Sequence, residues 1–317
     1  MDKVFKTADE QIAILVKRGV TISTPDQKSN AKKALQRFGY YSIINGYNDL
    51  FLVSKTPEDQ YKPGTTMEEI VAVYEFDKRL RNIMFKYILN VETNIRTLIS
   101  YYFSQQYGHD NYLIYNNFDT KKKDSTKNIT AVIAEVQRQL SSKYSDPAIA
   151  HYLSVYGYVP LWVLSNVLTF GQLSKFYNIM KTHERQQISR TFKILDNELE
   201  SILYYISTVR NFCAHNNRLY CFRNKHPLID LPAHKSLGIP VSPKGEYVYG
   251  KRDFYACVIA LMYVLPKAEY MRLIKELYRL FSDTSPKLSV INIQDLMNEM
   301  GFPTNWRNDL LSVVKAK

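Results

Sequence analysis

Apolar side chains recur at steps of three and four residues between positions 80 and 102, and this repeat constrains the fold more than any other feature. The positions are Leu80, Met84, Tyr87, Val91, Ile95, Leu98 and Tyr102. Steps of three and four align side chains on one face of an α-helix. Thr66 is a candidate N-cap, so we expect one long helix from Met67 toward Tyr107. A helix with one apolar face needs other helices to cover it, which favours a helical bundle.

Most of the remaining chain has the same helical period. Further helices are expected over residues 8–18, 26–37, 129–142, 147–156, 161–168, 173–182, 183–192, 197–209, 253–278, 293–300 and 305–314. The exception is 223–251, which holds four of the twelve prolines and could pair as a short strand at 246–249. We therefore predict an all-α fold, a helical bundle whose long helix packs antiparallel to the helix at 197–209. Its parts are an N-terminal helical extension (1–66), a helical core (67–223), and an irregular loop with C-terminal helices packed on the core (224–317).

The helix expected at 197–209 runs into the stretch Arg210-Asn-Phe-Cys-Ala-His215. Its core-facing stripe at 100° per residue consists of Leu199, Ile202, Leu203, Ile206, Val209 and Cys213. The opposite side carries Tyr204, Thr208, Asn211, His215 and Arg218. A row of polar, aromatic and titratable side chains on the face that is not packed against the core is typical of a functional surface. Arg210 projects close to the apolar stripe, so it needs an acid, a phosphate or a second subunit nearby.

Arginine and histidine at this spacing suit chemistry on RNA. Histidine can hold or release a proton near neutral pH, and arginine presents a fork of donors that matches phosphate oxygens. Together they could run the attack of a ribose 2′-hydroxyl on the adjacent phosphodiester. A structural interpretation is also open, in which Arg210 pairs with an acid to join helices and His215 caps the helix end. The hexapeptide alone favours the structural interpretation, because short motifs occur often by chance.

The wider sequence carries a family resemblance. The pattern R-N-x-x-A-H-x-x-R-L-Y from Arg210 resembles the signature of the HEPN superfamily, whose ribonuclease members carry R-x4-H. The rest of the chain is similar to the Abi-like family of bacterial abortive-infection proteins, of the AbiD/AbiF type. The similar blocks are residues 38–47, 76–81 with 91–96, 151–152, 160–162 with 168–171, and 300–306. Two positions depart from the family pattern: Asn166 stands where a glutamate is frequent, and Tyr220-Cys221 where tryptophan and asparagine are common.

The resemblance and the motif together predict a metal-independent endoribonuclease of anti-phage abortive infection, which leaves a 2′,3′-cyclic phosphate and a 5′-hydroxyl. His215 is then the acid–base group, Arg210 the phosphate clamp, and Asn211 the group that positions His215. Arg210 and His215 lie about 140° apart on a helical wheel, so a homodimer in which two motif helices meet would complete the site. The alternative is an RNA-binding module without catalysis, which holds a structured non-coding RNA.

Charge supports a polyanionic partner. The chain has 42 Lys and Arg against 30 Asp and Glu, a formal net charge of +12, which favours nucleic acid. The candidate RNA-contacting residues are Arg218, Tyr204, Lys121, Lys122 and Lys123. The lysine run at 121–127 is equally typical of a solvated loop.

Two acid–arginine pairs on the long helix share one spacing. Asp77–Arg81 and Glu92–Arg96 are each four residues apart, as in local helix-supporting pairs. A second interpretation is that they orient Arg210 or contact RNA. Local helix support is the favoured role, although the spacing alone does not distinguish it from the second interpretation.

The cysteines and the apolar runs of the sequence indicate the cellular compartment and whether a cofactor is expected. Three cysteines without a C-x-x-C pattern, and no histidine cluster at zinc spacing, predict a reducing cytoplasm and no metal or other cofactor. Residues 1–17 are charged and amphipathic, so no signal peptide is expected. The longest apolar run, Phe254–Leu265, has 12 residues, which is too short to span a bilayer. We expect a cytoplasmic protein without a membrane partner.

Overall fold

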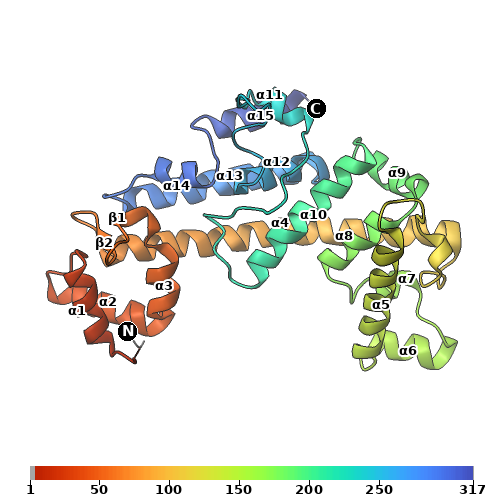
Figure 1. Cartoon of the computed structure of the whole chain (residues 1–317), viewed down its shortest axis with the longest axis horizontal. Helices are drawn as coiled ribbons and strands as arrows, with labels where there is room; N and C mark the ends of the chain where they lie inside the picture. Colours follow the sequence, from red (N-terminus) through yellow and green to blue (C-terminus); the bar gives the residue numbers. More distant parts are fainter. Residues whose placement is uncertain (1–3, 317) are drawn as a thin grey trace.

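The computed structural model describes residues 4–316 and is helical along most of this length (Figure 1). Helix α4 (Met67–Tyr107) forms the long axis, as its apolar repeat predicts. The remaining helices gather at its two ends and along one side (Figure 1). The predicted all-α fold is confirmed. Within the described residues the one sheet is a small antiparallel pair, β1 (Leu52–Ser54) with β2 (Gln60–Tyr61), which the helical patterns did not predict.

The elements follow one another in a simple order. Before β1 come α1 (Ala8–Lys17), α2 (Pro25–Phe38), α3 (Tyr40–Tyr47) and a 3-10 turn (Asp49–Phe51). After α4 come a 3-10 turn (Tyr115–Asn117), α5 (Ser125–Ser142), α6 (Pro147–Tyr156), α7 (Leu161–Leu164), α8 (Phe170–Ile179), α9 (Thr182–Thr191) and α10 (Asp196–Ala214). The chain ends with α11 (Pro232–Ser236), α12 (Phe254–Val264), α13 (Lys267–Thr284), a 3-10 turn (Ser285–Lys287), α14 (Ile293–Glu299) and α15 (Trp306–Ala316).

Two predicted N-caps are present. The Thr66 hydroxyl accepts a hydrogen bond from the backbone N–H of Glu69 at 3.3 Å and starts α4. The Thr24 hydroxyl accepts one from Gln27 at 3.2 Å, and the Gln27 side chain binds the Thr24 N–H in return. Such caps satisfy amides that have no partner inside the helix, so they set where each helix begins.

Three expectations need correction. The single helix expected over 253–278 is two helices, because Pro266 lacks an N–H and holds Leu265 extended between α12 and α13. Helix α7 ends at Leu164 rather than Leu168. The expected strand at 246–249 is reduced to one isolated bridge between Val241 and Tyr247. Helix α3 was not predicted.

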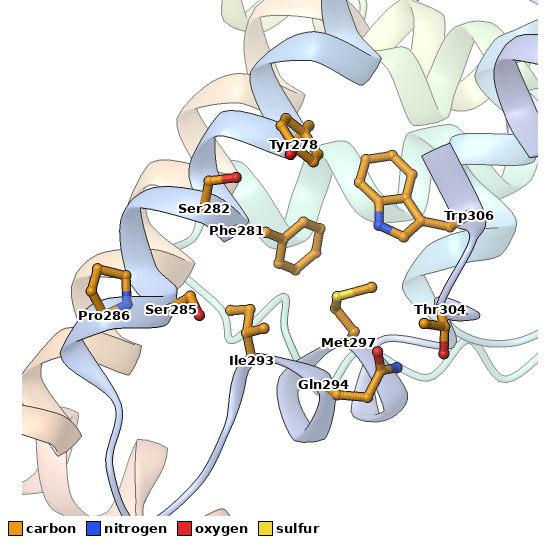
Figure 2. Close-up of a pocket in the computed structure, with 10 residues that line it drawn as sticks. All are labelled: Tyr278, Phe281, Ser282, Ser285, Pro286, Ile293, Gln294, Met297, Thr304 and Trp306. Atoms are coloured by element: carbon orange, nitrogen blue, oxygen red, sulfur yellow. The ribbon is translucent and has the colours of Figure 1, made fainter. Parts of the chain in front are cut away.

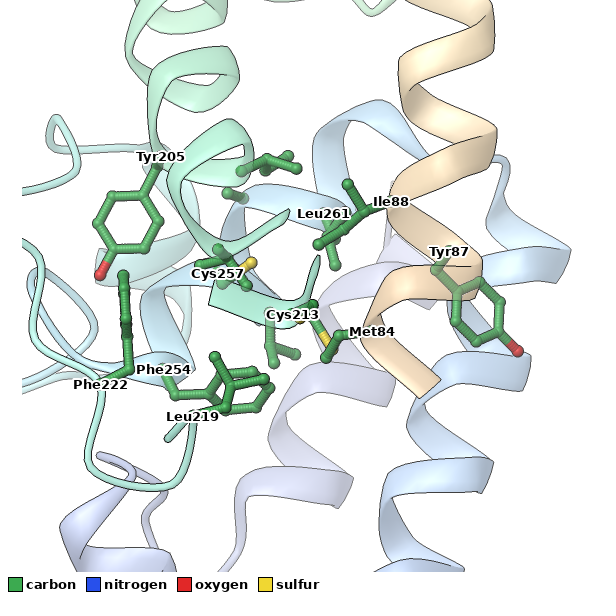
Figure 3. Close-up of a cluster of buried hydrophobic side chains, with 14 of the residues drawn as sticks. Met84, Tyr87, Ile88, Tyr205, Cys213, Leu219, Phe222, Phe254, Cys257 and Leu261 are labelled. Atoms are coloured by element: carbon green, nitrogen blue, oxygen red, sulfur yellow. The ribbon is translucent and has the colours of Figure 1, made fainter. Parts of the chain in front are cut away.

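The core holds α10 between α4 and α12. Figure 3 shows Met84 of α4 beside Cys213 of α10, and Ile88 of α4 beside Leu261 of α12. All six residues of the predicted apolar stripe on α10 are buried, and α12 is buried along its whole length. The Tyr205 hydroxyl donates to the carbonyl of residue 253 at 2.8 Å, which fixes α10 against the start of α12. This packing sets the rotation of α10 and leaves Tyr204, Asn211 and His215 exposed.

Helix α10 runs antiparallel to α4, as predicted. Arg210 near its end meets Glu92, and the residues after it, 217 and 219–220, meet Arg81 and Asp77. Helix α13 packs along α4 through polar contacts at its surface, including the ion pair of Lys86 with Glu276 at 2.6 Å. The C-terminal helices therefore lie on the core, while the three-part division of the chain stays a prediction.

None of the helices in the described part of the chain is both long and apolar enough to cross a membrane.

Candidate functional site

Arg210 is held by one edge of its guanidinium. Its Nε donates to Oε2 of Glu92 at 3.2 Å, and its Cζ lies 5.6 Å from the centre of the Phe85 ring. The side chain is 22% exposed. Among residues 4–316 no acceptor takes a hydrogen bond from its two terminal nitrogens. The part of the arginine that matches phosphate oxygens is therefore free.

Glu92 is the acid that Arg210 needed, and it serves a second arginine as well. Its other oxygen accepts from Arg96 at 3.0 Å, and the Nε of Arg96 donates to the carbonyl of Ser165 at 2.8 Å. The Glu92 side chain is only 6% exposed. One buried carboxylate between two guanidiniums leaves a net positive charge, which favours an anion at this point.

His215 caps the C-terminal end of α10 rather than projecting from inside the helix. Its backbone N–H donates to the carbonyl of Asn211 at 3.0 Å, and Asn216 turns the chain with a left-handed φ of 54°. The side chains of His215 and Asn211 are exposed, and neither makes a hydrogen bond or ion pair with a residue in 4–316. The imidazole is therefore presented at the surface, and the predicted Asn211–His215 side-chain contact stays a prediction.

Asp77 anchors the segment that follows His215. Its buried carboxylate accepts the backbone N–H groups of Leu219 at 3.0 Å and Tyr220 at 2.7 Å, and forms an ion pair with Arg81. A carboxylate that binds two amides holds the backbone itself, so α4 determines where the turn after α10 lies.

Arg81 joins the same anchor. Its guanidinium donates to the hydroxyl oxygen of Tyr47 at 3.2 Å and to the carbonyl of Asn217 at 3.4 Å. Burial by itself would lower the pKa of Arg81, but the carboxylate of Asp77 and the hydroxyl of Tyr47 outweigh burial and raise it. The guanidinium stays charged, and the turn between Asn217 and Tyr220 is tied to α4 at both ends.

The match to a known family covers this whole arrangement. The model of the Abi-like protein family matches residues 33–221, which is more than half of the chain and contains both α4 and α10. The chain belongs to the Abi-like protein family. No curated protein and no solved structure matches it. The matched region includes Glu92, Arg210 and His215 and ends directly after the segment that Asp77 anchors.

Arg218 and Tyr204 of this Abi-like protein make contacts outside the Arg210–Glu92 pair. Arg218 follows the end of α10, so it does not share the helix face predicted for it; its guanidinium donates to the carbonyl of Gly46 at 3.0 Å. Tyr204 is 42% exposed and packs edge-on against His226. It precedes His215 by eleven residues, or roughly 16 Å along a helix.

The three lysines at 121–123 differ in their exposure and contacts. Lys121 and Lys123 are exposed, but Lys122 donates to the carbonyl of Asn178 at 2.7 Å and lies 3.6 Å from Glu200. Burial lowers the pKa of Lys122, an effect that Glu200 partly offsets. Glu200 precedes His215 by fifteen residues, roughly 22 Å along α10. The structure does not bring these lysines to the motif.

A hollow of about 570 Å³ opens beside Arg96, between the second half of α4 and α7. Its lining includes Arg96, Ser100, Tyr101, Trp162 and Asn166. Asn166, where an acid was frequent in the resembling family, donates its amide to the carbonyl of Trp162 at 3.0 Å. The acid of this region is Glu92 from α4 instead. Nothing in the helical periodicity of α4 indicated the hollow, because it depends on where the short α7 packs.

A second hollow, of about 530 Å³, lies among α13, α14 and α15, with Phe281, Met297 and Trp306 around it (Figure 2). Its lining has no carboxylate, imidazole, guanidinium or amine. It contains no residue of the motif, so we assign no acid–base chemistry to it.

Within residues 4–316, no group of three or more His, Cys, Asp or Glu side chains could hold a metal ion. His234, in the proline-rich segment, is fully buried. Its Nδ1 accepts the N–H of Leu231 at 2.9 Å and its Nε2 lies 2.8 Å from the carbonyl of Gly250. Burial lowers the pKa of His234, so this ring is a neutral structural group.

Proposed function

We propose that this Abi-like protein is a metal-independent endoribonuclease of the HEPN type that acts in bacterial anti-phage abortive infection. The observation that carries the proposal is the free terminal fork of Arg210 on the same helix as an exposed, unengaged His215. The chain's net charge of +12 favours RNA as the polyanion. Membership of the Abi-like family supports the biological setting.

In the proposed reaction, a ribose 2′-oxygen attacks the adjacent phosphorus as His215 accepts the 2′-hydroxyl proton. The terminal nitrogens of Arg210 bind the non-bridging oxygens, where negative charge accumulates in the transition state. The bond from phosphorus to the 5′-oxygen breaks, and that oxygen takes up a proton. The products are a 2′,3′-cyclic phosphate and a 5′-hydroxyl. Glu92 is a positioning residue, since it binds only the Nε edge of Arg210.

We propose further that the active unit is a homodimer in which two α10 ends meet. Supporting observations are the exposure of Asn211 and His215 and the absence of a side-chain partner for either among residues 4–316. In an isologous dimer, one His215 could accept the 2′-hydroxyl proton while the other protonates the 5′-oxygen. Light scattering at micromolar concentration should give the mass of two chains. A one-chain mass with full activity would exclude this assembly.

The decisive test of the activity is His215→Ala. Loss of positioned proton transfer should reduce RNA cleavage by roughly 10²–10⁴-fold. Circular dichroism and the thermal midpoint should stay unchanged, because the side chain is exposed. His183→Ala, at an exposed histidine on α9, is the matched control and should cleave normally. Cleavage should survive EDTA and leave cyclic phosphate ends. Equal cleavage by both variants, or none by the wild-type protein, would refute the proposal.

The alternative is a non-catalytic module that holds a structured non-coding RNA. It is favoured by one observation, that no side chain among residues 4–316 orients the His215 ring. In this case RNA binding would be sensitive to salt and would survive His215→Ala, with no cleavage by either form. Sequencing the RNA that copurifies would separate the two functions, because cut ends mark a nuclease and a single intact species marks a holder.

A further inference from the structure

We propose that the hollow between α4 and α7 binds one unpaired nucleobase of the RNA whose phosphate Arg210 holds. The inference rests on the proposed RNA substrate, but not on catalysis. It assigns a role to Tyr101, Trp162 and Ser104, which the reaction at Arg210 does not use. The hollow lies between α7 and the second half of α4, two elements that are found on the right of Figure 1.

The hollow is connected to the arginine site through Arg96. Arg96 shares the carboxylate of Glu92 with Arg210 and also lines the hollow. Glu92, Arg96 and Ser100 succeed one another at steps of four, or roughly 6 Å of helix rise per step. A nucleotide chain held by Arg210 at its phosphate therefore reaches the hollow within a short stretch. Both arginines carry a positive charge, which suits a phosphate backbone that runs from Arg210 past Arg96.

The walls of the hollow are aromatic and open to solvent. Tyr101 is 60% exposed and Trp162 is 49% exposed, although large aromatic side chains usually bury most of their surface. The His109 ring lies 6.0 Å from that of Trp162 and extends the same wall. Planar faces of this kind stack on bases of any sequence. An aromatic wall next to a cationic site is the combination that single-stranded nucleic acid requires.

Two residues that line the hollow have unused hydrogen-bonding groups. The Ser104 Oγ is buried and has no hydrogen-bond partner. The Asn166 amide nitrogen binds the carbonyl of Trp162, while its side-chain oxygen takes no hydrogen bond from a residue in 4–316. Buried polar groups in proteins are normally paired, so an unpaired hydroxyl on a residue that lines a hollow points to a polar ligand. The edge of a nucleobase offers both donors and acceptors.

The size of the hollow suits a base, and its lining offers both apolar and polar partners. About 570 Å³ lies within the range of small-ligand pockets. The lining is mainly apolar, and Arg96, Ser100, Ser104 and Asn166 add the polar groups that the edge of a base can bind.

The chain offers a direct optical test. Its two tryptophans are Trp162, at the hollow, and Trp306, which is 3% exposed in the C-terminal core. In a Trp306→Phe background the emission reports Trp162 alone. The probe is a 2′-O-methyl RNA hexamer, which has no free 2′-hydroxyl and is not cleaved by the proposed route. An abasic hexamer of equal charge is the matched probe. We expect the base-containing hexamer to quench Trp162 and the abasic one to leave it bright.

Substitution sharpens the result. Tyr101→Ala should weaken binding of the base-containing hexamer by about 5- to 100-fold, the loss of one stacked base. Tyr144→Ala, at a 72% exposed tyrosine outside the hollow, should not change it. Equal quenching by both hexamers, salt-sensitive binding without quenching, or a two-chain mass that falls to one chain in Tyr101→Ala would overturn the base subsite. Quenching without any RNA cleavage would uphold the subsite and refute only the nuclease.

Discussion

Asp77 and Glu92 stand in the same sequence pattern but have different roles in the folded protein. Each is an acid four residues before an arginine on α4. Asp77 is fully buried and binds two backbone amides of the segment after α10. Glu92 binds the side chain of Arg210, which is partly open to solvent.

The difference lies in what remains free once the contacts are made. Around Asp77, the carboxylate, the tyrosine hydroxyl, the two amides and Nη1 of Arg81 all have partners, and Asp77 and Arg81 are buried, so this end of the interface is closed to solvent and holds the fold. Around Glu92, the terminal nitrogens of Arg210 stay unoccupied, so this end is open to a ligand. A site is marked by groups that the fold positions but does not satisfy.

The largest effect is expected from Asp77→Ala. Removing the carboxylate leaves Arg81 buried without a counter-charge, which typically costs about 3–5 kcal/mol in free energy of unfolding. Denaturant titration would measure it. Asp283→Ala, which breaks the exposed pair with Arg79 at 2.7 Å, is the control and should cost less than about 1 kcal/mol. Similar unfolding midpoints for the two variants would show that Asp77 does not anchor the fold.

Glu92→Gln should act mainly on activity. A hydrogen bond to a charged group contributes about 1.5–3 kcal/mol, so misplacing Arg210 should reduce kcat by roughly 10- to 100-fold. Stability should fall less than in Asp77→Ala, because Arg210 and Arg96 are 22% and 19% exposed and can be solvated.

Glu92→Asp keeps the charge and should recover part of the lost kcat, with KM changed less than kcat. If Glu92→Gln instead unfolds the protein as readily as Asp77→Ala while its folded fraction cleaves normally, Glu92 is a second structural anchor and the contrast is wrong.

The smallest effect is expected in the pH dependence of stability, through the buried His234. Burial lowers the pKa of His234 in the folded protein. Below about pH 6.5, His234 is therefore protonated in the unfolded chain more than in the folded protein. Stability is therefore lost as pH falls, by at most about 2 kcal/mol between pH 7.5 and 5 for one such site.

Urea midpoints at the two pH values would measure this loss. His234→Asn keeps a side-chain acceptor for the Leu231 N–H without a titrating group, so its stability should fall less over the same range. An identical fall in both proteins would show that the His234 ring titrates normally.

Local patterns predicted the helices well where one period ran uninterrupted. The repeat from Leu80 to Tyr102 and the cap at Thr66 predicted α4, and its observed bounds agree. The apolar stripe on α10 predicted which side of the motif helix is buried. The prediction failed at Leu265, where an unbroken apolar run hid the effect of Pro266 on the residue before it. It also failed for Arg218, because the helix ends before that position.

The sequence by itself determined the all-α class, the buried and free faces of α10, and the residues that could do chemistry there, because these follow from spacing along one helix. Only the tertiary structure decided which acid binds Arg210, because Glu92 is 118 positions away in the sequence. The sequence could not distinguish Glu92 from Asp77, since each acid precedes an arginine by four residues. The partner of a charged group depends on which helix packs against it and at what height. That contact is set by the whole core around α4, α10 and α12, and no local pattern contains it.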